Sequence, residues 1–307
     1  MSPPAVEIVD LVKRYGTKTA VDHLSLVVEV GAITAVLGPN GAGKTTTIET
    51  CEGYRTPDSG TVRVLGLDPQ RDERALKPRV GVMLQSGGVY PSLRATAMLK
   101  HVARLHAHPL DLDMLVDRLG LGSAGRTPCR RLSGGQQQRL SLAMAVIGRP
   151  EVVFLDEPTA GLDPQARRAT WELIEELQRD GVTVVITTHA MDEAERLADQ
   201  VVVVDHGAVV MAGSPAELMT HGAQNSLHLQ ARPGLDLVSL RAALPAATSV
   251  EETTPGAYVV TGEVDAQLVA DVTAWCAAEG VLPQSLAVER RTLEDVFLEL
   301  TGHGMRA

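Results

Sequence analysis

The chain has 307 residues, of which 44% are hydrophobic and 21% charged, and its net charge is −10. This apolar fraction over a length suited to about two domains excludes disorder as the main state, and the acidic balance argues against a general nucleic-acid binder. Because no apolar run approaches the roughly 20 residues of a membrane-spanning helix and the amino terminus lacks a secretory pattern, we expect a soluble, cytoplasmic chain.

Strand-like and helical runs alternate along residues 1–214, which is typical of a mostly parallel sheet covered by helices. Runs of Val, Ile and Leu without polar alternation predict strands buried on both faces. These are Ile33–Leu37, Val80–Leu84, Val152–Leu155, Val182–Thr187 and Val201–Val204. In the middle of the chain these strand-like runs are absent, and the apolar residues recur at helical spacing instead. The sequence therefore predicts an α/β domain over residues 1–214, with a helical subdomain inserted at about residues 86–149.

The pattern changes after Gly213-Ser214-Pro215. Residues 215–307 predict a strand, a helix, two strands, a helix and a strand, and this βαββαβ order favours a small α+β accessory domain of ferredoxin-like type. A last helix follows, capped by Thr292. Its apolar stripe, which needs a surface to dock on, consists of Leu293, Val296, Phe297 and Leu300.

A glycine-rich segment follows the first buried strand and precedes a helix that is expected to begin near Lys44. It reads Gly38-Pro39-Asn40-Gly41-Ala42-Gly43-Lys44-Thr45. The strand and helix on either side are the context that a phosphate-binding loop requires. Its backbone N–H groups can converge on phosphate oxygens, Lys44 can reach the β- and γ-phosphates, and the Thr45 hydroxyl can coordinate Mg²⁺. The alternative is a glycine-rich turn without a ligand.

Two carboxylates, Asp156 and Glu157, end the buried strand that begins at Val152. In an open α/β sheet this end lies beside the phosphate loop. Asp156 is expected to hold the magnesium ion, directly or through water, and Glu157 to polarise the attacking water as a base. An isolated acidic pair after a strand is more often a helix cap or a loop, but the phosphate loop upstream favours the catalytic interpretation.

A second candidate anion site is Leu132-Ser133-Gly134-Gly135-Gln136, which is expected to precede a helix from Gln137 to about Gly148. A helix start with a hydroxyl donor attached can bind a phosphate. An ordinary capped helix would explain Ser133 but not the paired glycines. One chain thus carries two phosphate-binding helix starts, which is unusual for a simple P-loop enzyme.

Together these segments resemble the nucleotide-binding subunits of ABC transporters, a family with a P-loop NTPase core. Gly38–Thr45 resembles the Walker A motif, Val152–Glu157 resembles Walker B, and Leu132–Gln136 resembles the family signature. The resemblance covers residues 5–214, and no motif carries a disabling departure.

The resemblance assigns roles to further residues. It implies that Tyr15 stacks on adenine, that Gln85 is the Q-loop glutamine that senses magnesium and the membrane partner, and that His189 is the switch histidine near the γ-phosphate. Without it, Tyr15 would be a strand-edge residue and His189 a structural one. Asp163 ends a segment that resembles the D-loop, and Thr46 extends the nucleotide contacts of Walker A. The implied catalytic residues are Lys44, Gln85, Glu157 and His189; the implied magnesium ligands are Thr45, Gln85 and Asp156.

The resemblance further implies ATP and Mg²⁺ as cofactors and a head-to-tail pair of ATP-binding subunits on the cytoplasmic face of the membrane, bound to a separate permease. Residues 292–302 look like the tail of the daunorubicin-resistance type of exporter, so we expect export of a drug, antibiotic or lipid-like compound. The alternatives are a soluble ABC-type ATPase acting on DNA or ribosomes, an importer ATPase, and a binding subunit without turnover. Because one nucleotide domain and an acidic balance disfavour the first alternative, no nucleic-acid partner is expected.

Overall fold

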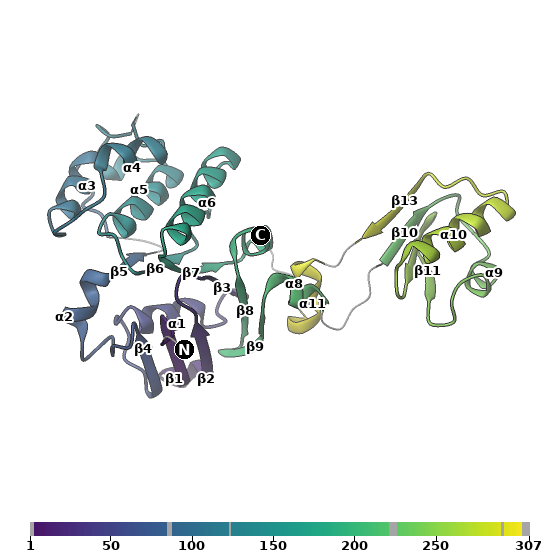
Figure 1. Cartoon of the computed structure of the whole chain (residues 1–307), viewed down its shortest axis with the longest axis horizontal. Helices are drawn as coiled ribbons and strands as arrows, with labels where there is room; N and C mark the ends of the chain where they lie inside the picture. The colour runs from purple at the N-terminus through teal and green to yellow at the C-terminus, as the bar shows by residue number, and fades with distance from the viewer. Residues whose placement is uncertain (1–2, 85–87, 123, 221–225, 290–291, 303–307) are drawn as a thin grey trace. The chain divides into compact units, whose positions relative to one another are not determined.

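The computed structural model describes residues 3–84, 88–122, 124–220, 226–289 and 292–302. The chain divides into two compact units between Pro215 and Ala216. Figure 1 shows the elements of both units. No helix within the described ranges is both long enough and apolar enough to cross a membrane.

A six-stranded sheet forms the centre of the first unit. In spatial order its strands are β5 (Val80–Met83), β6 (Val152–Asp156), β7 (Thr183–Thr188), β3 (Ile33–Leu37), β8 (Gln200–Asp205) and β9 (Ala208–Gly213). Neighbouring strands are parallel except at the β8–β9 edge. Every residue of β3, β6 and β7 is buried, as predicted for strands covered on both faces. The five strands expected from the apolar runs are all present in this sheet, whereas β9 was not predicted.

A separate antiparallel sheet, also not predicted, contains β2 (Lys18–Val28), β1 (Val6–Tyr15) and β4 (Ser59–Val64) in that order. Its buried side chains join those of β3, β6, β7 and β8 in one core. The turn between β1 and β2 pairs Tyr15 with Lys18. The hairpin therefore brings an aromatic and a basic side chain to the same end of the sheet.

The helices of the first unit follow in chain order. They are α1 (Lys44–Cys51), α2 (Glu73–Leu76), α3 (Ala95–Ala103), α4 (Leu112–Arg118), α5 (Gly134–Val146), α6 (Pro164–Arg179) and α7 (Met191–Leu197), with short 3-10 turns η1 (Lys77–Arg79) and η2 (Cys129–Arg131). Between β5 and β6 the described residues form helices α3, α4 and α5 and the turn η2, without a strand. Helix α5 begins at Gly134, so the expectation that the two glycines precede the helix is wrong. They form its first turn.

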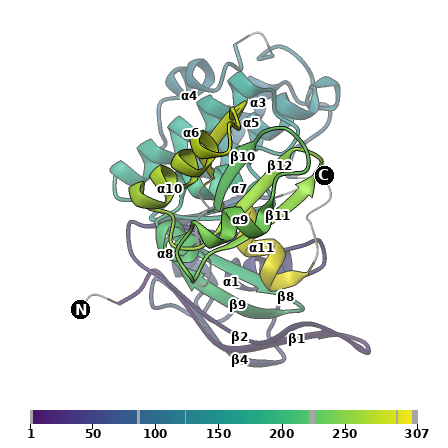
Figure 2. The same cartoon turned by 90° about the vertical axis from the view of Figure 1, so that its right-hand side faces the viewer.

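The second unit contains a four-stranded antiparallel sheet. Its elements are α8 (Pro215–Thr220), β10 (Ser226–Gln230), α9 (Leu237–Ala242), β11 (Ser249–Thr254), β12 (Ala257–Thr261), α10 (Ala266–Ala278), β13 (Ser285–Glu289) and α11 (Leu293–Thr301). The strand order β11-β12-β10-β13 is the ferredoxin-like arrangement. Helices α9 and α10 cover one face of the sheet (Figure 2), and their apolar side chains share a core with β10 and β12.

Helix α11 begins with a capping box, in which Thr292 and Asp295 each accept a hydrogen bond from the other's backbone N–H at 3.3 and 2.9 Å. Leu293, Val296 and Phe297 are buried. Three of the four residues of the predicted apolar stripe are therefore covered within the chain itself, and Leu300 is half-buried.

Candidate active site

The glycine-rich loop between β3 and α1 folds around the Lys44 side chain. Gly43 has a φ of 102°, and a Cβ there would lie 2.4 Å from the carbonyl oxygen of Ala20, so only glycine fits. Lys44 Nζ donates to the carbonyl oxygens of Gly38 at 2.6 Å and Pro39 at 3.1 Å. Burial lowers the pKa of Lys44, and the charges of two nearby carboxylates act in the opposite direction. An ammonium group has three donors, so one remains for an anion at the loop.

Asp156 lies at the end of β6 between two hydroxyl groups. Thr45 Oγ1 is 3.4 Å from its Oδ2, and Thr187 Oγ1 donates to its Oδ1. Burial raises the pKa of Asp156, and the neighbouring Glu157 charge raises it further, whereas the Thr187 hydroxyl and Lys44 lower it. A buried carboxylate whose charged form is disfavoured in this way gains from a nearby cation.

The backbone of Glu157 adopts a left-handed conformation with a φ of 50°, which is rare for a residue other than glycine. Its N–H donates to the carbonyl oxygen of Thr187 at 3.0 Å and lies 3.1 Å from the Thr187 hydroxyl, while Gln138 Nε2 donates to its carbonyl oxygen at 2.5 Å. The Glu157 carboxylate Oε1 lies 3.2 Å from Nδ1 of His189. These contacts fix a strained residue so that its carboxylate meets the histidine that follows β7.

The phosphate loop opens into a cleft of about 360 Å³ that both sheets help to form. Its lining residues are Tyr15, Lys18, Ala20, Asn40, Gly41, Gly43, Lys44, Thr45, Thr46 and Glu157. Tyr15 is 43% exposed, so it has surface available for a ligand. Lys13 Nζ and Arg55 Cζ lie 5.7 and 5.8 Å from the ring centre, which places positive charge around it. The cleft therefore combines an aromatic wall with a cationic loop and a carboxylate.

The predicted signature motif forms the amino terminus of α5. Ser133 Oγ accepts from the backbone N–H of Gln136 at 3.3 Å, and Gln136 Oε1 accepts from that of Ser133 at 3.0 Å, which is a capping box. A Cβ on Gly135 would lie 3.1 Å from Leu162 Cδ2, so α5 approaches the predicted D-loop closely. Asp163 caps α6 by accepting from Ala166 N at 2.9 Å.

The structure brings the predicted site residues together in two groups. The first group comprises Tyr15, the phosphate loop and Glu157, which line the cleft. Asp156 and His189 belong to it through their contacts with Thr45 and Glu157. Of the loop residues, Gly38 and Pro39 use their carbonyl groups to hold Lys44, and Ala42 is buried. The second group, outside the cleft lining, is Ser133, Gly134, Gly135, Gln136 and Asp163. Gln85 lies outside the described residues, so its predicted role stays a prediction.

Three residues near the site were missed by the sequence analysis. Lys18 and Ala20 enter the cleft from β2, which the apolar pattern did not predict. Thr187 contacts both Asp156 and Glu157. The position of Thr187 offered a signal. It lies near the end of a buried strand, and the polar residues there face the same edge of the sheet as the acidic residues that end the neighbouring strand.

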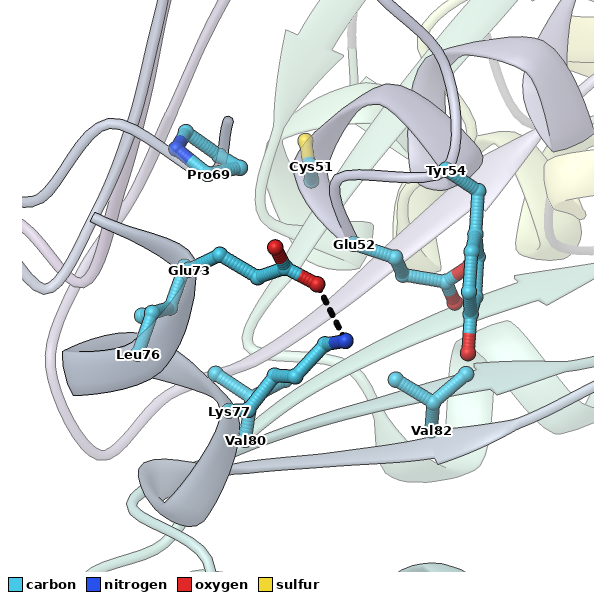
Figure 3. A pocket seen from close by; sticks show the side chains of 9 residues that line it. All are labelled: Cys51, Glu52, Tyr54, Pro69, Glu73, Leu76, Lys77, Val80 and Val82. Carbon is cyan, nitrogen blue, oxygen red and sulfur yellow. Dashed lines mark ion pairs between the residues drawn. The ribbon is translucent and has the colours of Figure 1, made fainter. Parts of the chain in front are cut away.

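A second pocket, of about 250 Å³, lies between the end of α1, helix α2 and strand β5. Figure 3 shows Glu52 beside Tyr54 on one side and the ion pair of Glu73 with Lys77 on the other. Burial, together with the charges of Asp156 and Glu49, raises the pKa of Glu52 to about 8. The folded chain therefore keeps a proton on Glu52 at pH values where the unfolded chain has released it.

We expect Glu52→Gln to stabilise the protein at alkaline pH. Because the folded pKa of about 8 exceeds the ordinary value of 4.5, the wild type loses stability as pH rises from about 4.5 to 8. The glutamine variant lacks this loss and should gain on the order of 2–4 kcal/mol in unfolding free energy at pH 8.5, but almost nothing at pH 4. Urea unfolding at both pH values measures it. Glu175→Gln, which breaks the surface pair with Arg196 at 3.2 Å, is the control and should not stabilise at either pH. An equal effect of Glu52→Gln at both pH values would contradict the prediction.

A strand, a phosphate-binding loop and a helix, with two carboxylates at the end of a parallel strand two positions away in the same sheet, define a nucleoside triphosphatase of the P-loop class. The comparisons with known proteins agree. A family profile described as ABC transporter matches residues 21–160. A daunorubicin resistance ATP-binding protein of Streptomyces coeruleorubidus is 36% identical, and the alignment covers 100% of this chain and 98% of that protein. A Nod factor export ATP-binding protein of Ralstonia nicotianae is 37% identical over 99% of this chain and 96% of its own.

Among solved structures, an ATP-binding subunit of an ABC transporter is 25% identical, with a TM-score of 0.65 over 70% of this chain and 91% of that one. The predicted fold class, an α/β P-loop NTPase core, is confirmed. The chain belongs to the ATP-binding proteins of ABC transporters, and it is an ATPase of that family.

Proposed function

We propose that the chain is the MgATP-hydrolysing subunit of an exporter, and that it powers a separate membrane permease. The observation that carries the proposal is the cleft in which the phosphate loop and Glu157 meet, with His189 in contact with the Glu157 carboxylate. Phosphoryl transfer depends mainly on positioning and charge neutralisation, and this cleft offers both.

In this proposal each side chain has one task in hydrolysis. The free donor of Lys44 and the N–H groups of the loop neutralise the phosphate oxygens. Glu157 orients the attacking water and accepts its proton, and His189 holds the Glu157 carboxylate and faces the γ-phosphate. The exposed ring of Tyr15 stacks on the base.

The residues around Asp156 fit a magnesium ion. Mg²⁺ prefers oxygen ligands and usually keeps several waters, so one or two protein ligands suffice. The hydroxyl of Thr45 and the carboxylate of Asp156 lie 3.4 Å apart, close enough to share one small cation. When bound, the ion would neutralise charge between the β- and γ-phosphates, and Thr45 and Asp156 would hold it, with Gln85 as a further ligand in the proposal.

We propose that two such chains pair head to tail, each completing the other's site. The signature residues Ser133–Gln136 do not line the cleft of their own chain. The first N–H groups of α5 have no acceptor within the helix, and the Ser133 hydroxyl can donate a hydrogen bond. This helix start is therefore suited to the phosphates held by a partner's loop, with Asp163 at the same interface. A solved cassette of this fold has been described as dimeric.

The proposed direction of transport rests on the relatives. Full-length matches include proteins named for daunorubicin resistance and for Nod factor export. We infer that the cargo is a drug-like, antibiotic or lipid-like compound, and that the permease holds this chain on the cytoplasmic face of the membrane. An importer remains the alternative, and the experiment below distinguishes the two.

We also propose residues 1–214 as the nucleotide-binding domain, with a helical subdomain at about 86–149, and residues 215–307 as an accessory domain. The boundary between compact units at Pro215 and the separate core of β10, β12 and α10 support this division.

Tyr15→Ala should weaken ATP binding by about 1–2 kcal/mol, the size of one lost aromatic stacking contact. Tyr15→Phe should bind like the wild type, because the ring is retained, and discrimination against GTP should stay poor. Calorimetric titration measures the affinities. Tyr54→Ala is a matched control, since Tyr54 is 57% exposed and lines the other pocket. Wild-type affinity in Tyr15→Ala would leave Tyr15 as a strand-edge residue.

The function is tested by reconstituting the chain together with its permease in lipid vesicles. We expect ATP hydrolysis to rise when the permease is present, and an apolar drug to move away from the side that carries the ATPase. Movement toward that side would show an importer. Hydrolysis that responds instead to DNA or ribosomes would overturn the proposal.

A further inference from the structure

Three charged residues, Lys44, Asp156 and Glu193, are buried in the part of the chain that the structure describes. The first two belong to the phosphate site. Glu193, on α7, has no exposed surface and no part in the mechanism given above. Burying a carboxylate costs several kcal/mol, so an apolar residue of similar volume would serve a purely structural role at lower cost. Glu193 therefore needs a different explanation.

The contacts of Glu193 join segments that all lead to the active site. Trp171 Nε1, on α6, donates to its Oε1 at 3.0 Å. Burial raises the pKa of the carboxylate, and the nearby hydroxyls of Thr188 and Thr159, with the Trp171 indole, lower it. Its second oxygen, Oε2, is buried without a hydrogen-bond partner among the described residues, so the two threonines are neighbours of the carboxylate rather than close donors to it. Thr188 directly precedes His189, and Thr159 lies two residues after Glu157. One side chain thus lies between the end of β7, the segment after β6 and helix α6.

We propose that Glu193 is a positioning residue for hydrolysis, which holds Thr188 and Thr159 so that His189 and Glu157 keep their mutual geometry. The proposal rests on the hydrolytic roles inferred above for those two residues. The distance between His189 Nδ1 and Glu157 Oε1 is 3.2 Å. Displacement of either flanking threonine would change this distance while leaving the phosphate loop, and hence ATP binding, intact.

The test compares Glu193→Leu with Glu193→Gln in the full-length protein. Leucine approximates the volume but accepts no hydrogen bond. We expect Glu193→Leu to lower kcat by about 10- to 100-fold with the KM for ATP unchanged, as for misplaced catalytic groups. Glu193→Gln should recover most of the loss, because an amide oxygen still accepts from Trp171 and the amide nitrogen can donate to a threonine hydroxyl.

Trp171→Phe removes the indole donor together with part of the ring, and it should lower kcat less than Glu193→Leu. Trp275→Phe is its matched control, because it removes a similar bond, from Nε1 to Ser239 Oγ at 3.1 Å, in the second unit. That variant should keep wild-type turnover.

A fluorescence measurement adds a readout that a purely structural role would not change. The sequence has 2 tryptophans, so in a Trp275→Phe background Trp171 is the only tryptophan and can be excited selectively over the tyrosines. Its emission should change when MgATP is added, and Glu193→Leu should abolish that change. A wild-type kcat in Glu193→Leu would overturn the proposal. It would also be overturned if, in both Glu193 variants, kcat fell only in proportion to the amount of folded protein lost. If Glu157→Gln also hydrolysed ATP normally, the proposed mechanism itself would be wrong.

Discussion

Glu157→Gln should bind ATP like the wild type but hydrolyse it about 10²–10⁴-fold more slowly, which is the usual contribution of a positioned general base. The amide keeps the shape of the side chain and removes the base with its negative charge. Because the backbone of Glu157 is held by Thr187 and Gln138 through main-chain atoms, the substitution leaves those bonds in place. Phosphate release at saturating MgATP measures the rate.

Glu151→Gln is the matched control for this experiment. Glu151 lies on the surface, just before β6, and pairs with Arg79 at 2.6 Å. Its loss should leave turnover unchanged.

Removing charge at position 157 should also stabilise a dimer that encloses two triphosphates, so Glu157→Gln with MgATP should elute as a dimer, and adding Ser133→Ala should weaken that dimer.

Lys44→Ala should abolish ATP binding or weaken it by about 10²-fold or more, as expected when one partner of a buried charged hydrogen bond is removed. Lys44 is only 7% exposed and is the cation that the phosphate loop itself supplies. Calorimetry with MgATP measures the affinity, and thermal unfolding verifies that the loop still folds without the bonds to Gly38 and Pro39. Lys77→Ala, which breaks the ion pair with Glu73 in the second pocket, should bind ATP normally. Unchanged affinity in Lys44→Ala would show that the loop does not hold the phosphates.

The sequence predicted the central sheet because its strands are buried on both faces. A continuous run of β-branched and other apolar residues such as Val152–Leu155 is a strong signal for a buried strand, and the phosphate loop between β3 and α1 depends only on local spacing. The antiparallel sheet was missed because its strands mix exposed and buried positions and contain bulges. Asp10 and His23, which adopt left-handed conformations with φ values of 54° and 52°, interrupt the period-two pattern on β1 and β2.

The start of α5 shows a different limit. Gly134 and Gly135 have low helix propensity, so the helix was expected to begin after them. The Ser133–Gln136 capping box and the close approach to Leu162 override that propensity. The S-x-x-Q spacing was visible in the sequence and could have identified the cap. The roles of Thr187 and Glu193 could not be predicted in this way, because their contacts join segments that only the folded sheet brings together.

The most direct test of the account is the chemical state of the nucleotide that Glu157→Gln retains in complex with its permease. The complex is loaded with radiolabelled MgATP, separated from free nucleotide, and the bound species are resolved by chromatography over time. The account predicts that the variant holds intact ATP under conditions in which the wild type holds and releases ADP. Conversion to ADP at the wild-type rate would contradict it and leave Glu157 as a structural carboxylate.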